Sequence, residues 1–141
     1  MSSVFNAIYT ILKSDSNIAP LVRDGNSPSY TYRIYELYTS QTATAPYITC
    51  QQLNIAPNNT KDGPSPLDEY SYQINIVAQT PQDAHTLAGY VRAALDYYSG
   101  TTAGVNVQKI FFETETNLWD DDSHLKGVAA FAQDYKIRIV R

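Results

Sequence analysis

The chain has 141 residues, one cysteine, a formal net charge of −4 at neutral pH and a pI near 4.9. A chain of this length buries roughly two thirds of the surface that its unfolded form exposes, so it needs neither a disulfide nor a metal ion to fold. The acidic balance and the scattered basic residues argue against a surface that grips a nucleic-acid backbone. We therefore expect a single domain over residues 1–141.

The first part of the chain predicts one helix followed by irregular structure. Apolar residues recur at helical spacing in a segment that Ser2 or Ser3 is suited to cap and that should end near Lys13, namely Phe5, Ile8, Ile11 and Leu12. Residues 18–22 are expected to form a short turn, because the residue before Pro20 disfavours helix. The D-G-N and S-P pairs within residues 23–31 predict a turn or a flexible excursion.

Two strands are expected next, over residues 33–38 and 45–53. Pro46 lies at the start of the second strand, where a proline does not interrupt the ladder of hydrogen bonds. Cys50 follows an apolar run, which favours a small buried side chain over a reactive thiol. A lone buried cysteine and the absence of a secretory n-region or a long apolar run indicate a protein made in the cytoplasm and not inserted in a membrane.

The clearest signals lie between residues 67 and 100. One side of an extended chain carries the apolar set Tyr70, Tyr72, Ile74, Ile76 and Ala78, which is typical of an antiparallel strand with one buried face. A helix should begin at Thr80 with Pro81 in its first turn and end at Ser99–Gly100. Its buried stripe is predicted to comprise Ala84, Leu87, Ala88, Val91, Ala94 and Leu95.

Two further strands complete the expected fold. Residues 105–113 predict a strand with an irregularity, because the apolar side changes parity between Val107 and Ile110. Residues 128–140 predict a closing strand with Tyr135, Ile137 and Ile139 inward and with Lys136, Arg138 and Arg141 on a solvated face rather than on nucleic acid. The expected class is α+β, a mostly antiparallel sheet of about five strands with two main helices packed on it, in the order helix, strand, strand, strand, helix, strand, strand.

Candidate chemistry is sparse. The one grouping that resembles a metal site is Asp120, Asp121 and Asp122 with His124, and neighbouring aspartates on a loop point in different directions. We interpret it as charged surface, with a divalent cation as the weaker alternative. His85 is interpreted as a solvated helix residue, and Asp68 and Glu69 should diverge on a strand. The sequence contains no recognisable set of a nucleophile and its general base, so we expect that the protein is not an enzyme and has no catalytic residue and no cofactor.

Association is the better-supported class of function. The twelve tyrosines suit half-buried sheets and interfaces. Trp119 in its acidic loop is either folded onto the domain or a binding hot spot. The polar segment 57–67 is either an inert connection or a segment that orders on a partner. A small enzyme or ligand-binding domain of similar build is the alternative, and it would require a deep pocket with convergent polar groups.

Several stretches, taken in order, resemble the tail-completion or tail-terminator proteins of long-tailed bacteriophages. They are V-F-N-A-I-Y-T-I-L-K-S-D, P-Y-I-T, D-G-P-S-P-L-D-E-Y-S-Y-Q-I-N-I-V-A, A-G-Y-V-R-A-A-L-D and Q-D-Y-K-I-R-I. The resemblance implies a structural virion protein that forms a hexameric ring at the head-proximal end of the tail tube, from subunits that are monomers before assembly. It also implies contacts with the major tail tube protein and head–tail connector proteins, with DNA only as passing cargo.

A ring requires that one face of a subunit meets a different face of its neighbour. We predict that two polar segments make the subunit or tube contacts. Their candidate interface residues are Asn58, Asn59, Lys61 and Asp62 in the first, and Leu118, Trp119, Asp120 and His124 in the second.

Overall fold

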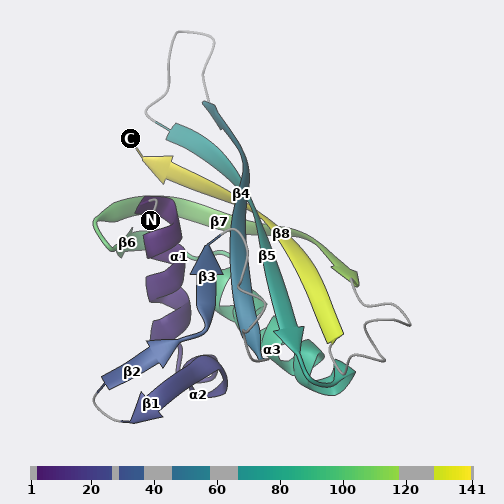
Figure 1. Ribbon diagram of the computed structural model, residues 1–141. Helices are drawn as coiled ribbons and strands as arrows, with labels where there is room; N and C mark the ends of the chain where they lie inside the picture. The colour runs from purple at the N-terminus through teal and green to yellow at the C-terminus, as the bar shows by residue number, and fades with distance from the viewer. Residues whose placement is uncertain (1–2, 27–28, 37–45, 58–66, 118–128, 141) are drawn as a thin grey trace, which may run out of the picture.

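The computed structural model describes residues 3–26, 29–36, 46–57, 67–117 and 129–140 (Figure 1). The fold is α+β, and its main sheet has six strands in the order β3-β4-β5-β8-β7-β6. These strands are β3 (Ile34–Glu36), β4 (Tyr47–Pro57), β5 (Leu67–Ala78), β8 (Ala129–Val140), β7 (Val105–Asn117) and β6 (Gly100–Thr102). Helices α1 (Ser3–Ser14) and α3 (Pro81–Leu95) pack against each other over the buried face of this sheet.

The centre of the sheet is the antiparallel pair β5 and β8. The pairing runs without a shift from Leu67 opposite Val140 to Ala78 opposite Ala129. Burial alternates from Ser71 to Ala78 in β5 and from Gln133 to Val140 in β8, because neighbouring side chains point to opposite faces of a sheet. The predicted inward sets are confirmed, with Tyr70 half-buried and the following members buried, namely Tyr72, Ile74, Ile76, Ala78, Tyr135, Ile137 and Ile139.

Helix α3 begins as its sequence predicts and ends earlier. The Thr80 hydroxyl accepts the backbone N–H of Asp83, and Pro81 occupies the first turn. The predicted stripe is buried except for Ala94, which is half-buried. The predicted end at Ser99–Gly100 is wrong. The chain leaves the helix after Leu95 because the backbone N–H of Tyr97 bonds the Ile110 carbonyl of β7, with Tyr97 at a positive φ of 64°.

The N-terminal region contains more regular structure than expected. Helix α1 agrees with its predicted extent, whereas residues 18–22 include a short helix, α2 (Ala19–Val22), with Pro20 in the first turn, where a proline is tolerated. Residues 23–31 are not an irregular excursion but supply the hairpin of β1 (Arg23–Asn26) and β2 (Ser29–Tyr32). Gly25 has a φ of 92°, and a Cβ there would lie 2.7 Å from the Ser29 carbonyl oxygen, so the hairpin requires glycine at this position.

The edges of the main sheet also differ from expectation. The sheet has six strands instead of about five, and it is mixed, because β3 pairs with β4 in parallel. Strand β6 lies in a segment that the sequence assigned to no element, and β7 continues to Asn117. The predicted irregularity of β7 is confirmed by register shifts between Val107 and Lys109 and between Phe112 and Thr114. A further shift occurs in β4 between Gln52 and Asn54.

Candidate interaction surface

The predicted interface residues lie outside the described parts of the chain. This holds for Asn58, Asn59, Lys61 and Asp62 in the first segment and for Leu118, Trp119, Asp120 and His124 in the second. Asp121 and Asp122, the other two residues of the weaker metal alternative, also lie outside the described residues. The structure does fix the points where each segment is attached. Pro57 pairs with Asp68 at the ends of β4 and β5, and Asn117 pairs with Phe131 at the ends of β7 and β8.

These two attachment points lie at opposite ends of the sheet. The first adjoins the Leu67–Val140 end of the β5–β8 ladder, and the second adjoins the Ala78–Ala129 end. Strand β5 has 12 residues, which corresponds to a length of about 36 Å at the rise of a β-strand. Both predicted interface segments therefore start from well-paired strands, and their attachment points are separated by the full length of the sheet.

The acidic and histidine side chains that the structure describes do not converge on a site. Among them, no group of three or more His, Cys, Asp or Glu side chains has the spacing to hold a metal ion. His85 is exposed on α3, with its ring 4.6 Å from the ring of Phe131. Asp68 and Glu69 point to opposite faces of β5, as predicted, and Glu69 lies 3.3 Å from the Arg138 guanidinium.

The groups with the most altered acidity are buried in the core. Burial, with a smaller contribution from Glu36, raises the pKa of the Cys50 thiol, which confirms the sequence-based interpretation of a buried side chain. Burial, followed by the charge of Asp96, raises the pKa of Tyr135. The Tyr135 hydroxyl donates to Gln133 Oε1 at 2.7 Å, and Gln133 Nε2 donates to the Ala88 carbonyl at 3.0 Å and to Glu115 Oε1 at 2.9 Å. These bonds fasten α3 to β8.

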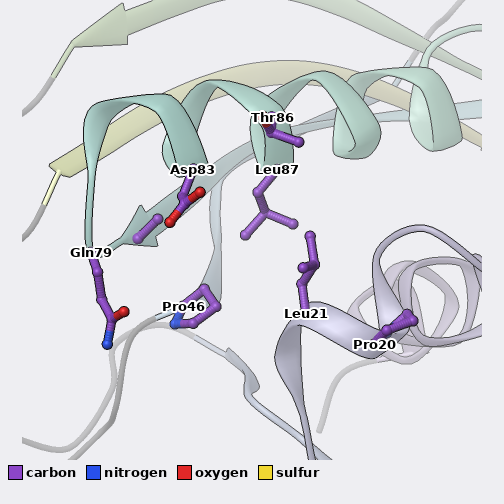
Figure 2. A pocket seen from close by; sticks show the side chains of 8 residues that line it. Pro20, Leu21, Pro46, Gln79, Asp83, Thr86 and Leu87 are labelled. Carbon is purple, nitrogen blue, oxygen red and sulfur yellow. The ribbon is translucent and has the colours of Figure 1, made fainter.

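A cavity of about 290 Å³ lies between α2, α3 and the adjoining ends of β4 and β5 (Figure 2). In the close-up, Leu21 of α2 and Leu87 of α3 extend toward each other across it, and Asp83 and Gln79 contribute polar atoms. None of the side chains with a raised pKa lines this cavity, namely Tyr9, Tyr47, Cys50 and Tyr135. The lining is mainly apolar, whereas a catalytic pocket is expected to have several convergent polar groups.

An exposed apolar strand segment was not expected from the sequence. Residues 51–56 of β4 are all exposed, and Leu53 and Ile55 keep 52% and 46% of their surface accessible. We call Gln51–Pro57 the outer segment of β4. The sequence suggested a strand only as far as residue 53, although the order Leu53-Asn54-Ile55 continues the alternation. Sequence reasoning thus missed an apolar surface next to a segment that it did propose as an interface.

The comparisons with known proteins assign the chain to a family. Residues 6–139 match the family described as tail completion protein gp17. The chain belongs to this family. A chain from the solved structure titled "Virion of native gene transfer agent (GTA) particle" is similar in fold, with a TM-score of 0.73 and 14% identity over 96% of this chain and 93% of that chain. No curated protein matches.

Family membership places the protein among structural components of phage tails and hence of virions. The predicted resemblance is therefore confirmed at the level of the family. The described helices include none with the length and apolarity needed to cross a membrane. The similarity to the gene transfer agent chain is evidence for the α+β architecture alone, because the two sequences share few residues.

Proposed function

We propose that this tail completion protein forms a ring at the head-proximal end of the tail tube, ends polymerisation of the tube and provides the surface to which the head attaches. Membership of the family over residues 6–139 is the observation that carries the proposal. In it, residues 1–141 act as one tail-terminator-like domain, six copies close the ring, and the copies are monomers before assembly.

The arrangement of the sheet supports an adaptor with two working ends. A protein between a tube and a head needs one surface for each, and the attachment points of the two polar segments lie at opposite ends of β5 and β8. In this proposal one segment contacts the major tail tube protein and the other contacts the head–tail connector proteins or the next subunit. The net charge of −4 is compatible with DNA passing through the ring as cargo without being bound.

The proposed contacts are Asn58, Asn59, Lys61 and Asp62 in one segment and Leu118, Trp119, Asp120 and His124 in the other. Trp119 is the proposed anchor, because large aromatic side chains supply much of the energy of protein interfaces. Its truncation to alanine is expected to cost about 2 kcal/mol or more of interface energy. Charged surface remains the proposed role of Asp121 and Asp122.

The experiment is removal of the chain from a particle-producing strain, followed by electron microscopy of the particles. Tails of irregular length that are not joined to heads are expected, and supplying the intact chain should restore normal particles. Particles without the chain that still carry joined tails of normal length would overturn the proposal.

A second complementation tests the proposed contacts. A chain with alanine at Asn59, Lys61 and Trp119 is expected to restore joining poorly. The matched control carries alanine at Gln82 and Gln108, which are exposed on α3 and β7, and is expected to restore joining fully. If the triple variant performs as well as the control, the assignment of these residues to the interface is wrong.

A further inference from the structure

The outer segment of β4 has a backbone edge that no described strand pairs. One side of this segment is bonded to β5, from Gln51 opposite Gln73 to Pro57 opposite Asp68. On the other side, the last pair that the described part of β3 makes with β4 is Glu36 with Cys50. An exposed strand with unpaired N–H and C=O groups is a template for another strand, and protecting charges are the common device against such pairing. The segment Q-Q-L-N-I-A-P carries no charge.

The opposite edge of the same sheet has a comparable opening. Strand β6 covers β7 only from Val105 to Val107, and the backbone of residues 97 and 98 bonds Ile110. The Asp96 carboxylate takes the N–H of Phe112. From Glu113 to Thr116, β7 is exposed and has no partner on that side among the described strands. This second edge is polar, with two glutamates.

The charges on the two edges favour pairing of β4 with β7 between copies over pairing of β7 with β7. Two copies paired through β7 would place Glu113 and Glu115 of each copy near those of the other, which is unfavourable across strands. The neutral outer segment of β4 brings no like charge to β7.

The strand directions also allow this pairing. From β4 through β5 and β8 to β7, each strand is antiparallel to the one before. A second copy placed beside the first in the same orientation therefore presents its β4 antiparallel to β7 of the first.

We propose that the outer segment of β4 in one copy pairs with residues 113–116 of β7 in a second copy, so that the sheets of neighbouring subunits join. This pairing is heterologous, and such contacts close into rings when the rotation permits. The proposal rests on the ring of the proposed function and names the surfaces that build it. Leu53 and Ile55 become buried in the contact, which accounts for their exposure in the isolated chain.

The two open edges lie at different heights in the sheet. The outer segment of β4 is level with residues 68–73 of β5, whereas Thr114 and Thr116 of β7 face Asp134 and Ala132 of β8, toward the other end. Neighbouring copies must therefore be staggered along the strand direction. Strands that close a sheet around an axis are tilted and staggered in this way.

The test is cross-linking in purified particles with the substitutions Asn54→Cys and Thr116→Cys in one chain. Both positions lie on the sheet face away from the helices, since Asn54 pairs with Ser71 and Thr116 pairs with Ala132. A short bismaleimide tolerates a small difference in register. The native Cys50 is fully buried with a raised thiol pKa, so it does not compete for the reagent. We expect a ladder of cross-linked species above the dimer.

The controls separate the alternatives. Each single variant and the pair Asn54→Cys with Ala93→Cys, whose second site is exposed on α3, are expected to stay monomeric. Adding Leu53→Lys to the doubly substituted chain should lower the cross-linked yield about tenfold, whereas adding Ala93→Lys should leave it unchanged.

Each remaining outcome has one meaning. A doubly substituted chain that is present in particles but stays monomeric overturns the edge pairing and leaves the ring standing. Dimers from Asn54→Cys alone overturn it in favour of contact between two β4 edges. Absence of the unsubstituted chain from purified particles contradicts the proposed function itself.

Discussion

The inner and outer segments of β4 share one ladder with β5 and differ in almost everything else. In the inner segment, Tyr47–Cys50, the side chains of Ile48 and Cys50 are fully buried. In the outer segment, Gln51–Pro57, Leu53 and Ile55 remain about half exposed. Backbone pairing with β5 is continuous across the boundary except for the shift after Gln52. Among the described residues, β3 pairs with the inner segment, from Ile48 to Cys50, and not with the outer segment.

This contrast separates the formation of a strand from the burial of its side chains. Hydrogen bonds to β5 keep the outer segment extended, but exposed side chains contribute little hydrophobic free energy. Segments with few buried apolar contacts open most readily, and binding surfaces are drawn from them. The inner segment therefore contributes to stability, while the outer segment is available for association.

The largest expected effect tests this division directly. Ile48→Ala removes a fully buried side chain of the inner segment, opposite Ile76, and is expected to lower the free energy of unfolding by about 2–5 kcal/mol. The matched Ile55→Ala, in the outer segment, should cost less than about 1 kcal/mol, since half of the side chain already faces water. Urea unfolding of both variants measures the difference. Similar losses would show that the two segments are not energetically distinct.

Polar contacts at the level of the inner segment should contribute more to stability than those at the level of the outer segment. Gln133 is 1% exposed and holds Tyr135, so Gln133→Ala leaves the buried hydroxyl without its acceptor and should cost about 1–3 kcal/mol. Glu69 and Arg138 lie at the level of the outer segment and are partly exposed, so Glu69→Ala should cost less than about 1 kcal/mol.

Two apolar replacements refine the expectation for Gln133. Gln133→Leu combined with Tyr135→Phe removes both members of the bond and is expected to recover part of the loss of Gln133→Ala. Urea unfolding of the single and double variants provides the cycle. If the double variant is as unstable as the sum of its single changes, the hydrogen bond is not the reason for the cost.

The long elements were predictable because their residues repeat a period. Alternation in residues 70–78 identified β5 and its buried face, and Thr80-Pro81 identified the start of α3. The short elements α2, β1, β2 and β6 were not predictable, since three or four residues do not establish a period. Parallel pairing of β3 with β4 depends on where the chain returns after a long connection, which local sequence does not encode.

The candidate surfaces were predictable only in part. The polarity of residues 58–62 and 118–124 marked them as possible contacts, and both lie outside the described residues. The outer segment of β4 was missed because the predicted strand ended at Leu53 and the alternation of residues 53–55 does not show whether that part of the strand is covered. Their exposure depends on which parts of the sheet the other described elements cover, and local sequence does not encode this. The same limit hid the early end of α3, which follows from backbone bonds to Ile110.

The last expected effect concerns pH and returns to β4. Burial raises the pKa of the Cys50 thiol in the native state, whereas an unfolded thiol ionises near pH 8.5. Below that pH both states hold the proton and stability is complete. Above it the unfolded state loses a proton that the native state keeps, so the free energy of unfolding should fall by about 1.4 kcal/mol per pH unit. Tyr135, whose pKa is also raised, adds to the fall above about pH 10.

Moving the thiol along the strand isolates this contribution. Urea unfolding between about pH 7.5 and 9.5 should show the fall in the native chain and a weaker one in Cys50→Ala. The double variant Cys50→Ala with Leu53→Cys should behave like Cys50→Ala, because an exposed thiol ionises at a similar pH in both states. A native chain with the same pH dependence as Cys50→Ala would mean that water reaches the inner segment of β4. The distinction between the two segments would then lie in side-chain packing alone.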